Sequence, residues 1–184
     1  MPHLRRFASL ALAVLALGSA ALRAESLAPE KQALLDKKIE EIKTWAADPV
    51  VVKAVVAQNT SLPAAYAEMT QDKWKSLTLL DPFVRGFTKN EVGSALKTRK
   101  IAWLSEAFVN DAKGLKVGFL GKTSSWSHGS SAKHTDPMGG KTWQGALELD
   151  ESTGLQQVQV AVPVLAEGRP AGSLVVGVSV AKLE

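Results

Sequence analysis

The chain has 184 residues, 46% of them hydrophobic, and no cysteine, which excludes disulfides, thiolate metal sites and covalent c-type haem. Its formal charge is +4, but Arg5, Arg6 and Arg23 lie in the first 24 residues, so the remainder has 19 basic and 18 acidic residues. Because the positive excess almost disappears with that segment, binding to nucleic acid is not expected.

The N-terminal segment has the pattern of a secretory signal peptide. Two arginines precede an apolar run over residues 7–22, and small residues follow up to Ala24. The run is about 16 residues long, shorter than the ~20 needed to span a bilayer. We predict that residues 1–24 are a signal peptide cleaved between about Ala20 and Ala24, and that residues 25–184 form one periplasmic domain. The alternative is an uncleaved anchor.

The first half of the predicted domain has helical periodicity. Apolar residues recur every three or four positions over residues 29–47, which predicts an amphipathic helix. Asp48-Pro49 interrupts the chain and restarts it, because proline suits the first turn of a helix. Further helices are predicted over residues 50–58 and 64–80, and Asp81-Pro82 is the next stop. Thr88 and Glu91 form a capping box before a helix that ends near Arg99.

After Lys100 the apolar pattern has a period of two. Strands are predicted over residues 101–110, 115–120, 143–150, 155–165 and 171–180, with turn residues between them. Residues 122–141 are rich in Ser, Thr, Gly and His and are predicted to form a loop of about 20 residues. Loops of that length are uncommon in compact domains and are often functional. The predicted fold class is α+β, with helices followed by five antiparallel strands.

Four stretches of the second half are informative in their order and spacing. They are residues 105–111 with Gly114, residues 122–126, residues 160–164 and residues 172–178. Together they resemble the extracytoplasmic PAS-like sensor domains of the Cache, or PDC, family, over about residues 90–183. The resemblance implies a five-stranded antiparallel sheet with a long N-terminal helix packed on one face. It also implies a small-molecule site on the other face, closed by the segment between the second and third strands.

The resemblance carries expectations about partners. Domains of this family usually belong to receptors, where a membrane helix and a signalling module follow them. Here the chain ends at Glu184, just past the last strand, so we expect a separate membrane receptor or histidine kinase as partner. The family's receptors also suggest a homodimer through the N-terminal helix; a solvated helix face is the alternative.

The last two strands predict where a ligand site lies. Side chains alternate along a strand, so the fourth and fifth strands each have an apolar face and a face of small or polar residues. The apolar positions are Val158, Val160, Val162, Val164, Leu174, Val176, Val178 and Val180, and the opposite positions are Gln157, Gln159, Ala161, Pro163, Ser173, Val175, Gly177 and Ser179. We predict that the apolar face packs on the helices and that the second face lies under the ligand. An ordinary solvated face is the alternative.

The candidate ligand-binding residues are Lys122, Trp126, His128 and Trp143 on the loop side and Gln157 and Gln159 on the sheet. Tryptophan rings offer flat surfaces for an apolar ligand or a cation, and Lys122 and the histidines offer charge for a carboxylate. The alternatives are core positions for the tryptophans and solvent exposure for the others. The predicted ligand is a small organic carboxylate, amino acid or amine, with no cofactor.

Other chemistries have weaker support. His128, His134 and Asp136 are competent metal ligands, but their spacing matches no established motif, so no metal is predicted. No nucleophile–base pair is evident, and an enzyme is not expected. Two alternative functions are left open: an interaction module without a ligand, and a haem or metal carrier that uses the loop histidines.

Overall fold

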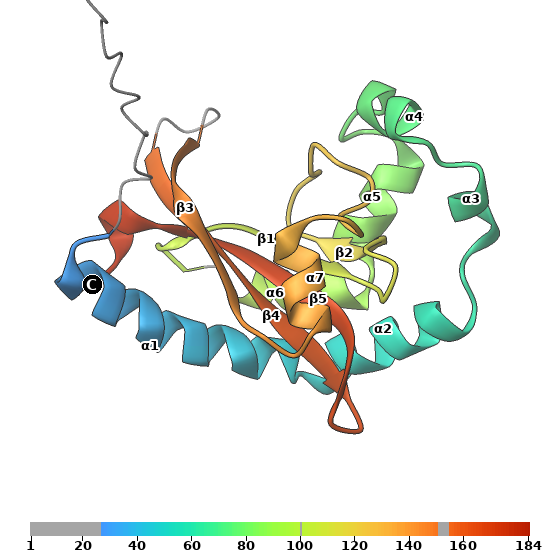
Figure 1. Cartoon of the computed structure of the whole chain (residues 1–184). Coiled ribbons are helices and arrows are strands. Elements are labelled where there is room, and N and C mark those ends of the chain that lie inside the picture. The colour runs from blue at the N-terminus through green and yellow to red at the C-terminus, as the bar shows by residue number, and fades with distance from the viewer. Residues whose placement is uncertain (1–26, 100, 151–154) are drawn as a thin grey trace, which may run out of the picture.

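The computed structural model describes residues 27–99, 101–150 and 155–184, so the predicted signal peptide lies outside the described residues. The helices and strands, in chain order, are α1 (Pro29–Ala46), α2 (Pro49–Thr60), α3 (Ala64–Ala67), α4 (Gln71–Ser76), α5 (Pro82–Lys89), α6 (Glu91–Thr98), β1 (Leu104–Asn110), β2 (Lys116–Phe119), α7 (Ala132–Met138), β3 (Trp143–Asp150), β4 (Leu155–Ala166) and β5 (Arg169–Ser179), followed by a 3₁₀ turn, Val180–Lys182 (Figure 1).

The five strands form one antiparallel sheet in the order β2-β1-β5-β4-β3. Val158 lies opposite Val178 and Val160 opposite Val176, so the apolar positions of β4 and β5 share a face. These valines are buried in one core with α1 and α2, which run along this face of the sheet (Figure 1). The predicted packing of the apolar face against the helices is confirmed, as is the α+β class.

Helices α1 and α2 follow from the sequence signals. In α1, Leu35, Ile39, Ile42 and Trp45 are buried at intervals of three or four residues. Both helices begin with proline, and the Asp48 carboxylate accepts a hydrogen bond from Val50 N at 2.9 Å as the N-cap of α2.

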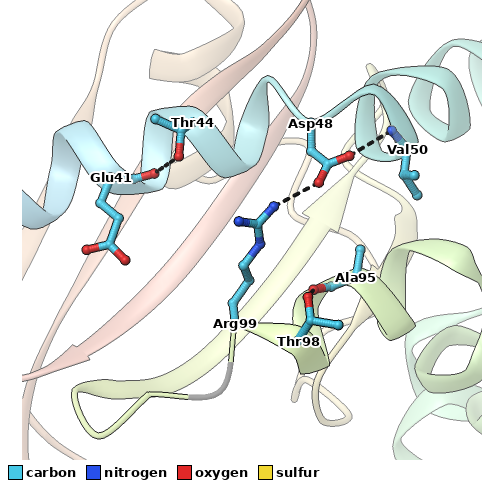
Figure 2. A network of polar contacts seen from close by, with 7 residues as sticks. All are labelled: Glu41, Thr44, Asp48, Val50, Ala95, Thr98 and Arg99. Atoms are coloured by element: carbon cyan, nitrogen blue, oxygen red, sulfur yellow. Dashed lines mark hydrogen bonds and ion pairs between the residues drawn. The ribbon is translucent and has the colours of Figure 1, made fainter.

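A polar contact ties this helix junction to α6 (Figure 2). Arg99, at the C-cap of α6, donates from Nη2 to Asp48 Oδ2 at 2.8 Å. The guanidinium also lies 5.9 Å from the ring centroid of Trp45. Asp48 therefore caps one helix and pairs with the end of another, which fixes α6 against the α1–α2 corner.

Three local predictions were wrong. Residues 64–80 form two short helices, α3 and α4, rather than one. Asp81-Pro82 begins a helix instead of ending one, because the Asp81 carboxylate accepts from Phe83 N and caps α5. The cap of α6 is Asn90, whose Oδ1 accepts from Gly93 N at 2.8 Å, so the proposed capping box is absent.

The long segment between β2 and β3 is partly helical. It was predicted to lack regular structure, but residues 132–138 form α7, which packs against β3, β4 and β5. His134 of α7 is hydrogen-bonded to Ser173 of β5. The Ser173 side chain lies on the face of the sheet opposite the α1 core. No helix in the described part of the chain is both long and apolar enough to cross a membrane.

Candidate functional site

The second face of the sheet is covered by two different kinds of packing. Toward α4 and α5 it carries a buried aromatic cluster that contacts Ala161 and Val175 of the sheet. The members of the aromatic cluster are Tyr66, Trp74, Phe83, Phe87, Phe108, Phe119 and Trp126. The part of the face near Gln157 and Gln159 is not filled by this cluster.

A cavity of about 430 Å³ lies over that unfilled part of the sheet. Its volume is within the usual range for small-molecule sites. Residues from β1, β3, β4, α7 and the segment before α7 line it: Glu106, Phe108, Lys122, Thr123, Ser124, His128, Lys133, Leu149, Gln157 and Gln159. The cavity therefore lies between the second face of the sheet and the segment between β2 and β3, and it is partly open to solvent.

Four of the six predicted ligand residues line this cavity: Lys122, His128, Gln157 and Gln159. Trp126 does not, because its ring is buried in the aromatic cluster, 4.9 Å from Tyr66 and 5.2 Å from Trp74 between centroids. Trp143 is half-buried beside the same cluster, and Lys133 Nζ lies 5.9 Å from its ring centroid. The two tryptophans therefore occupy packing positions near the cavity, which was the alternative considered for them.

Opposite charges meet across one amide on the cavity wall. Lys133 Nζ donates to Gln159 Oε1, and Gln159 Nε2 donates to a carboxylate oxygen of Glu106. These bonds orient the amide with its oxygen toward the cation and its nitrogen toward the anion. This part of the wall thus presents one cation and one anion, separated by the width of a side-chain amide.

The segment that closes the cavity is held by α4. Gln71 Nε2 donates to Ser124 O, and its Oε1 accepts from Trp126 N, both at 2.9 Å. Trp74 Nε1 donates to Thr123 O at 2.7 Å. Residues 123–126 therefore keep their position over the sheet through two side chains of one short helix.

A fully buried lysine lies behind the cavity wall. Lys116 Nζ donates to Asn110 Oδ1 at 2.9 Å and contacts Nδ1 of His128. It also lies 4.6 Å from the ring centroid of Phe108, whose ring stacks on the His128 imidazole at 4.8 Å. His128 therefore separates the lysine from the cavity and contacts both.

Burial controls the protonation of this pair. Burial, and then repulsion from Lys133, lowers the pKa of Lys116 from 10.5 to about 7, although Asp111 and Glu106 oppose the change. Burial and the neighbouring lysines lower the pKa of His128 to about 3, so its imidazole is neutral at pH 7. A neutral His128 Nδ1 accepts a hydrogen bond from Lys116 without competing for its proton.

His134 belongs to the interior of the domain. Its Nδ1 lies 2.8 Å from Ser173 Oγ, which accepts from Asn110 Nδ2 at 3.0 Å, and its Nε2 lies 3.3 Å from Ala112 O. Burial lowers the pKa of His134 below its ordinary value. Within the described ranges, no group of three or more His, Asp or Glu side chains is arranged to hold a metal ion.

Sequence reasoning missed Glu106, Phe108 and Lys133. Glu106 and Phe108 are two residues apart on β1, so their side chains share a face. That signal was present in the predicted strand but was not followed to the cavity. Lys133 lies on α7, and without that helix nothing indicated its direction.

Comparisons with known proteins give structural matches only. No protein-family model matches the chain, and no curated protein matches it. It is similar to the ligand-binding domain of the Campylobacter jejuni chemoreceptor Tlp3 in complex with 4-methylisoleucine, at 12% identity and a TM-score of 0.44 over 82% of this chain and 54% of the other. It is also similar to the V. cholerae histidine kinase DctB sensor domain, at 13% identity and a TM-score of 0.35 over 82% of this chain and 57% of the other. A third similar structure is the ligand-binding domain of the Pseudomonas aeruginosa PAO1 amino acid chemoreceptor PctC in complex with GABA, at 14% identity and a TM-score of 0.37 over 81% of this chain and 63% of the other.

One of these structures is described as a sensor domain and the other two as ligand-binding domains. The chain spans between about half and two thirds of the length of each of the three.

Proposed function

We propose that this protein is a periplasmic sensor-type protein of the Cache kind that binds a small organic molecule reversibly and does not catalyse a reaction. The observation that carries the proposal is the cavity of about 430 Å³ over the second face of the sheet, with charged groups of both signs on its wall. Lys133 and Glu106 are half-buried at this wall, where each can pair with a group of opposite charge on a small molecule.

The wall favours an amino acid among the three ligand classes that the sequence suggested. Lys133 and Lys122 attract a carboxylate, and Glu106 attracts an ammonium group. Gln159 already bridges Lys133 and Glu106, so a ligand with both charges matches the spacing that its amide occupies. Phe108 and Leu149 offer apolar contact for the rest of the molecule.

The cavity also borders contacts through which ligand binding would move a side chain of helix α2. Lys116, behind His128, accepts at its carbonyl oxygen from Tyr66 OH at 2.9 Å and from Gln58 Nε2 at 3.1 Å. Gln58 is in α2, so a shift of β2 on ligand binding moves the acceptor of a helix side chain. We propose that a separate membrane receptor or histidine kinase detects this change, and that the protein forms a homodimer through α1.

The test is a thermal-shift screen of amino acids, carboxylates and amines, followed by calorimetry on each compound that raises the melting temperature. Glu106→Gln is expected to lower the affinity for amines and amino acids at least tenfold. Lys133→Met is expected to lower the affinity for carboxylates and amino acids by a similar factor. The matched control is Lys113→Met, because Lys113 is exposed in the β1–β2 turn, and it is expected to leave the affinity for every compound unchanged.

The pattern of losses identifies the ligand class. An amino acid is indicated if Glu106→Gln and Lys133→Met both lower the affinity for the same compound. If no compound raises the melting temperature and no small molecule co-purifies with the protein, the binding proposal is wrong and an interaction module without a ligand is the better description.

A further inference from the structure

The turn between α4 and α5 exposes two consecutive leucines. Leu80 is 79% exposed and Leu79 is 61% exposed, the highest and the third-highest values among the large apolar side chains of the described residues. The turn is closed by its own hydrogen bonds, since Asp81 N donates to Thr78 O at 3.2 Å and Leu80 N donates to Thr78 Oγ1 at 3.3 Å. The Leu79–Leu80 turn therefore has a defined shape with both side chains in solvent.

Basic side chains flank the Leu79–Leu80 turn on both sides. Lys73 and Lys75 are exposed in α4, and Arg85 and Lys89 are exposed in α5. On α5 the buried positions are Val84 and Phe87, so Arg85 and Lys89, four residues apart, lie together on the outer face. Residues 71–89 contain these four cations and two acids, Asp72 and Asp81, although residues 25–184 are almost neutral.

We propose that the Leu79–Leu80 turn docks on the surface of a bilayer that contains anionic phospholipids. The two leucines enter the boundary between headgroups and acyl chains, and the four cations lie at the level of the lipid phosphates. Apolar side chains with a basic surround are the usual means of interfacial binding, and each cation near an anionic surface adds attraction.

A protein partner fits the surface less well. A stable protein interface buries about 800 Å² on each side, and two protruding leucines supply only a small part of that area. The other large exposed apolar residues of the described chain are Val56, Ile101, Leu149 and Leu165, none of them in α4 or α5. Lipid accepts a small protruding apolar group without requiring a matched concave surface.

The position of the turn relates it to the cavity. Helices α4 and α5 lie at the end of the molecule away from the beginning of α1 (Figure 1). The turn follows α4 directly, and Gln71 and Trp74 of α4 hold the segment that closes the cavity. Contact with a bilayer at the Leu79–Leu80 turn therefore acts on the same short helix that positions the cavity's cover.

A local fluorescent probe tests this proposal on the full chain. Because the protein has no cysteine, Ser76→Cys, exposed at the end of α4, gives a single attachment point for an environment-sensitive nitrobenzoxadiazole label near the leucines. Lys53→Cys, exposed on α2, gives the matched control label. We expect the emission of the label at position 76 to shift to the blue with vesicles of equal phosphatidylglycerol and phosphatidylcholine, and that of the label at position 53 not to shift.

Two further variants separate the apolar and the charged contributions. Leu79→Ser with Leu80→Ser is expected to remove the shift and to reduce the vesicle partition coefficient at least tenfold. Arg85→Gln with Lys89→Gln is expected to reduce partitioning several-fold at low salt and little at high salt. Unchanged circular dichroism and melting temperature establish that the variants are folded, as expected for exposed positions.

Two results would overturn the proposal. One is the absence of a blue shift at position 76 with anionic vesicles, which would leave a protein partner as the occupant of the turn. The other is a shift that persists in the double leucine variant. Ligand binding in the cavity is measured separately, without vesicles, so failure of this proposal is distinct from failure of the proposed function.

Discussion

Replacing Lys116 by methionine tests the buried lysine through the pH dependence of stability. The side chain has no exposed surface, and burial lowers the pKa of its ammonium group from 10.5 to about 7 in the folded protein. The unfolded chain therefore binds more protons than the folded protein between these two pH values. The free energy of unfolding must then rise as the pH rises through this window.

The size of the effect follows from the two pKa values. With a pKa of about 7 in the folded state and 10.5 in the unfolded state, the free energy of unfolding is expected to rise by about 2 kcal/mol between pH 7 and pH 9. The chain has no cysteine, so no thiol titrates in this window. Burial raises the pKa of Tyr66 above its ordinary value of 10.0, which lowers stability only at higher pH, where the unfolded state releases the phenol proton first.

The assay is urea unfolding followed by tryptophan fluorescence at pH 7, 8 and 9. The native protein and the Lys113→Met control are expected to gain about 2 kcal/mol over this range, and Lys116→Met is expected to gain much less. If Lys116→Met shows the same rise as the native protein, the dependence on pH has another source and the account of Lys116 is refuted.

Three further substitutions probe the packing. Trp74→Ala is expected to lower the free energy of unfolding by about 3–5 kcal/mol, because it removes a fully buried ring from the aromatic cluster; urea unfolding measures it. Asp48→Ala is expected to cost more than Arg99→Ala by about 1 kcal/mol, since it removes a helix cap as well as an ion pair, and equal losses would show that the cap adds nothing. Gly172→Ala is expected to cost about 2 kcal/mol or more, because its Cβ would lie 2.3 Å from the Asn110 carbonyl oxygen; a melting temperature near that of the native protein would contradict this.

The strands and their two faces were predictable because alternation is a local property of the sequence. Val158 and Val160 point to the helices and Gln157 and Gln159 to the cavity, as the period of two required. The helix start at Pro82 could also have been predicted, since Asp81-Pro82 repeats the Asp48-Pro49 signal that begins α2.

The remaining site residues depended on tertiary structure. Lys116 is a lone lysine in a short apolar strand, and a charged side chain there ordinarily indicates the solvent side. Its burial results from His128 and Asn110, which come from other segments. Trp126 was assigned to the ligand because large rings suit both roles, and only the aromatic cluster shows which one its surroundings favour.

Alternation along β4 has a consequence for how such a domain diverges. Residues 157 and 159 line the cavity, whereas residues 158 and 160 belong to the helix-facing core, although all four are consecutive in one strand. A substitution at residue 157 or 159 can therefore change the cavity wall while the helix-facing core is left intact. The chemistry of the cavity wall and the packing of the helix-facing core can therefore vary independently along one strand.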